Sequence, residues 1–427
     1  MGVHPASARR EAGDRRGVAV ARAFPPGFLW GTASAAHQVE GGNRNNDWWE
    51  WEQKPGHIAD GSSSAVACDH YHRYREDFAL LRELNQNAHR MSIEWSRVEP
   101  SEGVFDAQEI QHYGDVLGAI RDAGMTPMVT LHHFTSPSWF VRKGGWAARD
   151  AHRAFMPFVH KVVEELGDRV GIWCTVNEPS IYGFNGWMSG EFPPGRKGDL
   201  RGHIRVTWNM RIAHELAYKA IKTRWPDAPV GLSHHKFLVL SATKRRRDYF
   251  AAAVAQGFTD RWPAGGPRVS PIVEATADYI GIAHYWGQLA QLARRPGEMF
   301  IRRFNPPDER VTDFGFASRP SWMGDVLRSL KKYRKPVYVT ENGIATTDDE
   351  WRRQYLGEIL GQVHGAIADG VDVRGYFHWT NTDNFEWSRG YTAHFGLIAV
   401  DRLTLERTVK PSGRMYARIA AANAVLD

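Results

Sequence analysis

A chain of 427 residues, 42% of them hydrophobic, can bury a large core, and its length allows two or three ordinary domains or one large α/β barrel. The net charge is +6 and the pI is near 9.2, but 54 Lys and Arg are interspersed with 48 Asp and Glu. Basic clusters such as RRR at 245–247 lie in no recognition motif, so we expect no nucleic-acid partner. No run of 18 consecutive apolar residues occurs, so we expect no membrane-spanning helix.

The N-terminal residues differ in composition from the rest of the chain. Residues 1–22 are rich in Arg, Ala and Gly, and the stretch GVAVARAF is too short and too polar for a signal-peptide core. We predict a disordered tail at 1–22 and one domain at 23–427, because no linker or composition break follows. The two cysteines, Cys68 and Cys174, provide no disulfide framework and suggest a reducing, cytoplasmic location.

Short runs of β-branched and aromatic residues alternate along the chain with longer amphipathic stretches, a pattern typical of parallel strands joined by helices. One amphipathic stretch, IQHYGDVLGAIRDAG, ends at a glycine that suits a helix stop. Eight predicted strands follow in chain order: FLWGTAS from Phe28, AHRMSIEW from Ala88, TPMVTLHHF from Thr126, GIWCTVN from Gly171, PVGLSHH from Pro229, DYIGIAHYW from Asp278, KPVYVTEN from Lys335 and VRGYFHW from Val373.

Eight such strands favour an α/β fold with a single (β/α)8 TIM barrel, although a doubly wound open sheet gives a similar alternation. In such barrels the chemistry lies where the strands end and the loops begin. Two glutamates stand at matched positions there, Glu178 in TVNEP and Glu341 in YVTENG.

Either glutamate alone could be a solvated loop residue or a residue at a helix N-terminus. The fourth and seventh strands, however, are three apart in an eight-strand ring, so their ends face each other across the mouth. A pair of carboxyl groups placed in this way suits hydrolysis of a glycosidic bond, in which one group protonates the leaving oxygen and the other attacks the anomeric carbon.

The order of several motifs resembles that of the family 1 glycoside hydrolases. They are FLWGTASAAHQVEG, HYHRYREDFALLREL, NAHRMSIEWSR, TVNEP, YVTENG and DNFEW. The resemblance extends from Phe24 to about Tyr416 and implies a (β/α)8 barrel that hydrolyses small β-linked glycosides with retention of configuration. It further implies that Glu341 is the nucleophile and that Glu178 is the acid/base.

The resemblance assigns two supporting residues, Arg90 and Tyr285, which we expect to lower the pKa of Glu341. Burial and the charge of Glu341 are expected to keep Glu178 protonated until the glycosyl-enzyme forms. The residues that match the family's sugar contacts are Gln38, His133, Asn177, Trp379, Glu386 and Trp387. Each has an alternative interpretation, as a helix cap, a core histidine or a packing tryptophan.

Histidine-rich segments raise the possibility of a metal site. They are CDHYH at 68–72 and the pairs at 132–133 and 234–235. Their spacing fits no structural zinc pattern, and adjacent residues on a strand point to opposite faces. We therefore expect no metal and no cofactor.

Two departures from the family pattern concern the sixth strand and the connection before it. Ala283 and His284 occupy positions where family members usually have Asn and Tyr, which removes an expected amide donor near the nucleophile. The connection at 248–278 is shorter than in most members, so we expect a reduced wall on the leaving-group side.

The resemblance implies a β-glucosidase first, and several alternatives stay open. A β-galactosidase, a β-fucosidase and a transglycosylase of the same family fit the same motifs. A non-catalytic sugar-binding relative is a further alternative, although such relatives lose one of the carboxylates. The sequence does not indicate an oligomeric state.

Overall fold

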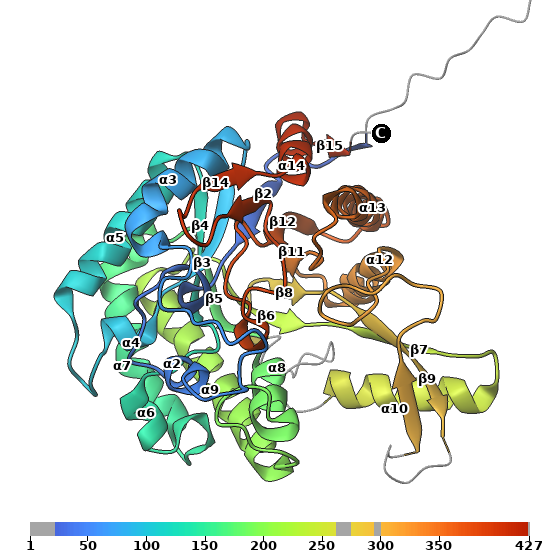
Figure 1. Cartoon of the computed structure of the whole chain (residues 1–427), viewed down its shortest axis with the longest axis horizontal. Helices are drawn as coiled ribbons and strands as arrows, with labels where there is room; N and C mark the ends of the chain where they lie inside the picture. Colours follow the sequence, from blue (N-terminus) through green and yellow to red (C-terminus); the bar gives the residue numbers. More distant parts are fainter. Residues whose placement is uncertain (1–21, 262–274, 294–299, 426–427) are drawn as a thin grey trace, which may run out of the picture.

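A computed structural model describes residues 22–261, 275–293 and 300–425 of the chain. Eight parallel strands close into a barrel in the order β11-β12-β2-β3-β4-β5-β6-β8 (Figure 1). This closure excludes the open sheet, and each of the eight predicted runs forms one barrel strand. The strands are β2 (Leu29–Ala33), β3 (Ala88–Ser92), β4 (Thr126–His132), β5 (Ile172–Asn177), β6 (Val230–His235), β8 (Ile280–Ala283), β11 (Val337–Asn342) and β12 (Val373–Trp379).

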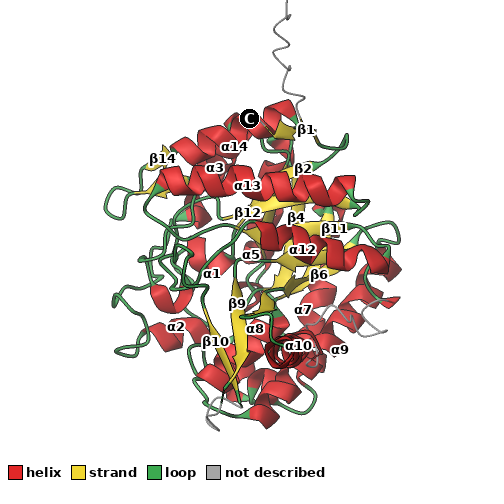
Figure 2. Ribbon diagram, turned by 90° about the vertical axis from the view of Figure 1, so that its right-hand side faces the viewer, coloured by secondary structure: helices red, strands yellow, loops and turns green. Residues whose placement is uncertain are grey.

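Helices surround the barrel, as Figure 2 shows around the central strands. The longer ones are α3 (His70–Glu83), α5 (Ala107–Asp122), α7 (Ala151–Leu166), α9 (Leu200–Arg224), α12 (Ser321–Leu330), α13 (Asp349–Ala368) and α14 (Pro411–Ala422). Shorter helices follow the strand ends: α1 (Ala36–Val39), α2 (Asp47–Glu52), α4 (Trp95–Val98), α6 (Ser138–Arg142) and α8 (Pro179–Phe184). Apolar side chains of strands and helices pack together between these two layers and form the core.

Helix α5 illustrates how the sequence sets these boundaries. The Asp106 carboxylate accepts hydrogen bonds from the backbone N–H groups of Gln108 and Glu109, which caps the first turn. Gly124 follows the last turn with a φ of 78°, a left-handed conformation that glycine adopts without a steric penalty. The predicted glycine stop is therefore confirmed.

A small sheet extends the barrel beside β6 and β8, and the sequence analysis did not predict it. Strands β7 (Leu238–Ser241) and β9 (Gly287–Leu292) continue β6 and β8 outward and pair in parallel. Strand β10 (Ile301–Phe304) pairs with β9, and helix α10 (Arg246–Arg261) packs against this sheet (Figure 1). The sequence analysis expected the connection at 248–278 to be short. Within it, residues 262–274 lie outside the described residues.

The two ends of the described chain meet. Strand β1 (Arg22–Ala23) pairs antiparallel with β15 (Ala424–Val425), and β13 (Ile398–Val400) pairs with β14 (Arg407–Val409). Apart from Arg22, the predicted tail at 1–22 lies outside the described residues. Within the described ranges, no helix has the length and apolar character needed to cross a membrane.

Candidate active site

Glu178 is positioned by the junction between β5 and α8. Its backbone is left-handed, with a φ of 39°, and its N–H donates to the carbonyl of Ser233 on β6 at 2.9 Å. Pro179 begins α8, where its lack of an N–H is harmless because the first turn leaves its N–H groups unpaired. A left-handed conformation at a non-glycine residue is strained and occurs most often at functional sites. The motif NEP thus places a carboxyl at the barrel mouth through a fixed, strained turn.

Glu341 lies within β11, and each of its carboxylate oxygens has a partner. Oε1 forms an ion pair with the Nη1 of Arg90, and Oε2 accepts from the Tyr285 hydroxyl at 2.8 Å. The structure therefore brings Arg90 and Tyr285 into direct contact with Glu341. The carboxylate is thus held in one orientation from two sides.

The residues that follow Glu341 fix the end of its strand. Asn342 donates to the carbonyl of His284 at 2.5 Å and to the Tyr355 hydroxyl at 2.9 Å, which ties β11 to β8 and α13. A Cβ at Gly343 would lie 2.1 Å from the Trp379 carbonyl, a distance that no side chain tolerates. The motif ENG is therefore explained by strand-end packing around the carboxylate.

Arg90 connects four barrel strands through one guanidinium group. The side chain is 1% exposed, and its Nη2 donates to the Asn177 Oδ1 at 2.7 Å while its Nε donates to the Thr130 hydroxyl at 3.1 Å. Nη1 also reaches the Thr340 carbonyl at 3.2 Å. A buried guanidinium with these partners is fully satisfied, and it fixes the amide of Asn177 as well as Glu341.

The net pKa of Glu341 corrects an expectation from the sequence. Burial raises it to about 7, and the negative charge of Glu178 acts in the same direction. Arg90 and Tyr285 lower the pKa as expected, but burial outweighs them. Because the charge of Glu178 affects the pKa of Glu341, the two carboxyl groups interact electrostatically.

A second hydrogen-bonded cluster joins the end of β12 to Gln38, which lies in the short helix α1 and not in a loop as the sequence suggested. The Gln38 Nε2 donates to the Glu386 Oε2 at 3.0 Å, and the indole N–H of Trp379 points to the same oxygen at 3.4 Å. Burial raises the pKa of Glu386 to about 8, with Glu341 and Glu178 adding to the rise. Gln38 Oε1 is buried and has no hydrogen-bond partner among the described residues.

His133 links this cluster to the catalytic side. Its Nε2 lies 3.1 Å from the Asn177 amide nitrogen, and its ring stacks with Trp379 at 5.7 Å and with Trp387 at 6.1 Å between ring centres. Burial lowers the pKa of His133 well below its usual range, so the ring is neutral. Hydrogen bonds and ring contacts therefore join nine of the ten residues that the sequence analysis assigned to the site, and Glu178 interacts with them through its charge.

The side of the mouth above β6 and β8 is lined by partly buried aromatic rings. Trp286 lies between Phe237, at 4.6 Å between ring centres and nearly parallel, and Phe316, at 5.2 Å. Beside them His284 bonds the carbonyl of Lys236 at 2.5 Å, and burial lowers its pKa to about 4. His284 thus holds the ends of two strands together.

One residue in contact with Glu178 was missing from the predicted site. The Nδ1 of His235, at the end of β6, lies 2.7 Å from the Glu178 Oε1. The sequence analysis considered the pair 234–235 only as metal ligands. A signal was available in the alternation of the strand, which places only one of two adjacent histidines on the mouth side.

The other histidine-rich segments have separate partners. His132 bonds the indole N–H of Trp146 at 3.0 Å, while His70 and His72 each bond an aspartate at 2.6 Å. Cys68 is buried and points to the Asp383 carbonyl. Among the residues described, no group of three or more His, Cys, Asp or Glu side chains could hold a metal ion.

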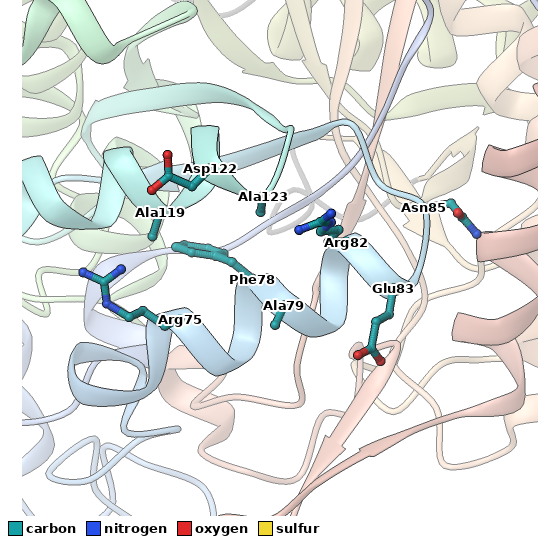
Figure 3. Close-up of a pocket in the computed structure, with 9 residues that line it drawn as sticks. All are labelled: Arg75, Phe78, Ala79, Arg82, Glu83, Asn85, Ala119, Asp122 and Ala123. Carbon is teal, nitrogen blue, oxygen red and sulfur yellow. The ribbon is translucent and has the colours of Figure 1, made fainter.

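A hollow of about 540 Å³ lies between α3 and α5, away from the strand ends (Figure 3). Arg75, Phe78, Arg82 and Asp122 are among the residues that line it. None of the ten site residues lines it.

Comparison with known proteins agrees with this geometry. The family model for glycosyl hydrolase family 1 matches residues 20–265 and 269–425. The chain belongs to glycosyl hydrolase family 1. It is 31% identical to beta-glucosidase A of Acetivibrio thermocellus, over 94% of this chain and 98% of that protein. It is 30% identical to beta-glucosidase A of Thermotoga maritima, over 95% and 99%.

Solved structures of family 1 enzymes share the fold. A beta-glycosidase from Pyrococcus horikoshii has a TM-score of 0.86 at 35% identity and covers 95% of this chain, with 97% of its own length matched. The T. maritima beta-glucosidase in complex with glucoimidazole has a TM-score of 0.87 at 29% identity, covering 94% and 100%. Family 1 membership makes this protein a glycoside hydrolase, of the class that cleaves β-glycosides with retention of configuration.

Proposed function

We propose that this family 1 enzyme is an exo-acting β-glucosidase in which Glu341 is the nucleophile and Glu178 the acid/base. The observation that carries the proposal is the pair of buried carboxyl groups at the ends of β5 and β11, one held by Arg90 and Tyr285 and the other at a strained turn. Relatives about 30% identical over nearly their whole length are beta-glucosidases, which supports the choice of glucose.

In the first step, an oxygen of Glu341 attacks the anomeric carbon while Glu178 transfers its proton to the leaving oxygen. The bond from carbon to the leaving oxygen breaks, and a glycosyl ester forms on Glu341. Esterification removes the negative charge of Glu341. Glu178, now a carboxylate, then takes a proton from water, and that water oxygen displaces Glu341 with a second inversion.

The sugar is bound by the cluster around Glu386. Gln38 Oε1 is a buried acceptor and the Nδ1 of His133 is a buried nitrogen, and neither has a protein partner in the described residues, so both suit hydroxyl groups of a sugar. Trp379 supplies an aromatic face beneath the ring. Asn177 and Trp387 complete the contacts, which fix the non-reducing glucosyl unit and favour exo action.

The substrate is an unphosphorylated sugar. The charges of Glu341 and Glu178 raise the pKa of Glu386, so this part of the site already disfavours negative charge. A phosphate dianion bound there would lie close to three carboxyl groups, and Arg90 could not neutralise it because Arg90 is bonded to Glu341. The free, buried Cys68 and Cys174 support a cytoplasmic location.

Two measurements test the proposal: the anomeric configuration of the first product, and the residue that carries the trapped glycosyl intermediate. Hydrolysis of an aryl β-glucoside followed by NMR is expected to give the β-anomer of glucose first, before mutarotation. A 2-fluoro-2-deoxyglucoside with an activated leaving group is expected to label Glu341, which mass spectrometry of peptides would locate. First release of α-glucose, or a label on another residue, contradicts the proposal. Faster turnover of β-galactosides or β-fucosides would correct the choice of sugar, and a dominant disaccharide product would indicate transglycosylation.

A further inference from the structure

His235 contacts the proposed acid/base from a neighbouring strand, and no part of the mechanism above uses it. Its Nδ1 lies 2.7 Å from the Glu178 Oε1, and both side chains are 7% exposed. Because water has little access to a hydrogen bond between two such buried groups, the bond restricts the orientation of both side chains. This contact fixes which way the Glu178 carboxyl faces.

The strand register explains why a histidine fits at this point. His235 on β6 pairs with Ala283 on β8, and Ala283 pairs with Glu341 on β11. Side chains at paired positions of adjacent parallel strands project to the same face of a sheet. Ala283 contributes only a methyl group there, which leaves room for the imidazole of His235 beside it.

The strand also shows which of the two histidines faces Glu178. His234 lies on the opposite face and interacts with His214 of α9, and burial lowers its pKa to about 4. Other titratable groups near His235 are Lys236, which follows β6, and His284, which follows β8, besides Glu178 itself. Of these groups, Glu178 is the one that carries a carboxyl, and His235 is hydrogen-bonded to it.

We propose that His235 is a positioning residue for the acid/base, an inference that rests on the proposed function. The Nδ1–H of a neutral His235 donates to Oε1 of Glu178, so the acidic proton of Glu178 resides on Oε2. In the first step that proton passes from Oε2 to the leaving oxygen, and in the second Oε2 takes a proton from water. His235 keeps its own proton throughout, and its Nε2, buried without a partner among the described residues, carries the lone pair of this tautomer.

The experiment compares His235→Leu with His235→Asn, measured on aryl β-glucosides whose leaving groups span a range of acidity. Leucine keeps the approximate shape and removes the donor, whereas the Asn Nδ2 lies the same number of bonds from the backbone as the His Nδ1. For phenyl glucoside, His235→Leu is expected to lower kcat/KM by about tenfold to a hundredfold, a fraction of what general acid catalysis contributes. For 2,4-dinitrophenyl glucoside, kcat/KM should stay within about threefold, while kcat and KM fall together because the second step is slowed.

His235→Asn is expected to retain most of the activity toward phenyl glucoside. His234→Leu, a matched loss of histidine on the same strand, should behave like the wild-type enzyme with both substrates. A uniform loss across all leaving groups in His235→Leu, or an Asn variant as poor as the Leu variant, would overturn the inference. If His235→Leu does not fold, His235→Gln replaces it, since its amide reaches the Nε2 position and should fail where Asn succeeds.

Assays of the wild-type enzyme distinguish failure of the proposed function from failure of the role of His235. Absence of β-glycosidase activity in the wild type refutes the proposed function. Normal wild-type activity with a flat leaving-group dependence in His235→Leu refutes only the role of His235.

Discussion

The two sides of the barrel mouth hold their side chains by different forces. Around Glu386, the groups are fixed by hydrogen bonds within a buried network that includes Gln38, Asn177 and His133. Around Trp286, partly buried rings are held by stacking. A site built from hydrogen bonds rejects a sugar that lacks a matching hydroxyl far more strongly than a stacking surface rejects a different ring. The enzyme should therefore be selective for the sugar and tolerant of the leaving group.

The largest expected loss of activity comes from removing either of the two catalytic carboxyl groups, on which both sides of the mouth depend. Glu341→Ala should lower kcat by a factor on the order of 10⁴ or more for every substrate, because no nucleophile remains. Azide should restore turnover from the vacated face and give the α-glycosyl azide. Glu178→Ala should instead keep the first step with dinitrophenyl glucoside, and azide should then give the β-glycosyl azide.

Stereochemistry of the azide products by NMR decides the assignment. The same anomer from both variants, or normal turnover of phenyl glucoside by Glu178→Ala, would show that the roles are assigned wrongly. The two variants serve as controls for each other, because each removes one buried carboxyl from the barrel mouth.

The next effect concerns Arg90, which belongs to both the catalytic pair and the sugar-binding network. Arg90→Met should destabilise the fold by about 3–5 kcal/mol, because Glu341 is left buried without its cation. The double variant Arg90→Met with Glu341→Gln should be more stable than Arg90→Met alone, since the unpaired charge is gone. Urea unfolding at pH 7 measures both. Equal stabilities of the single and double variants would show that the ion pair is not what holds Arg90 in place.

The sequence predicted the barrel and one side of its mouth, and the reasons are physical. Each barrel strand lies in a short run that contains β-branched or aromatic residues, and the two glutamates at the strand ends lie in the short motifs NEP and ENG. The extension formed by β7 and β9 was missed because β7 follows β6 after two residues and β9 follows β8 after three, so each pair of runs merges in the sequence. His235 was missed because its role depends on the register that puts Ala283 beside it. The net pKa of Glu341 was misjudged because the extent of burial is a property of the whole fold.

A smaller effect is expected from Glu386, the centre of the hydrogen-bonded side. Its pKa rises from about 4.5 in the unfolded chain to about 8 in the native state, so the native state binds more protons between these values and stability falls as pH rises from 4.5 to 8. Glu386→Gln should remove this contribution and stabilise the protein by about 1–3 kcal/mol at pH 8.5, with little change at pH 4. Activity should fall about tenfold to a hundredfold, because a sugar contact is weakened.

Thermal or urea unfolding at the two pH values tests this expectation. Glu341 contributes a slope of the same sign, with its pKa near 7, so the variant should keep a reduced slope. A variant that is less stable than wild type at pH 8.5 would show that the hydrogen bonds from Gln38 and Trp379 outweigh the cost of burying the charge.

The smallest effect is expected on the stacked side. Trp286→Ala removes the middle ring of the stack with Phe237 and Phe316, and loss of one such contact is worth about 1 kcal/mol, or about fivefold in kcat/KM for aryl glucosides. Methyl glucoside, which has no ring to stack, should be nearly unaffected, and the ratio of glucoside to galactoside hydrolysis should not change. Trp208→Ala, at an exposed tryptophan of α9, is the matched control. An equal loss for methyl and aryl glucosides would mean that Trp286 shapes the site as a whole, and a changed sugar preference would show that the two sides of the mouth are not independent.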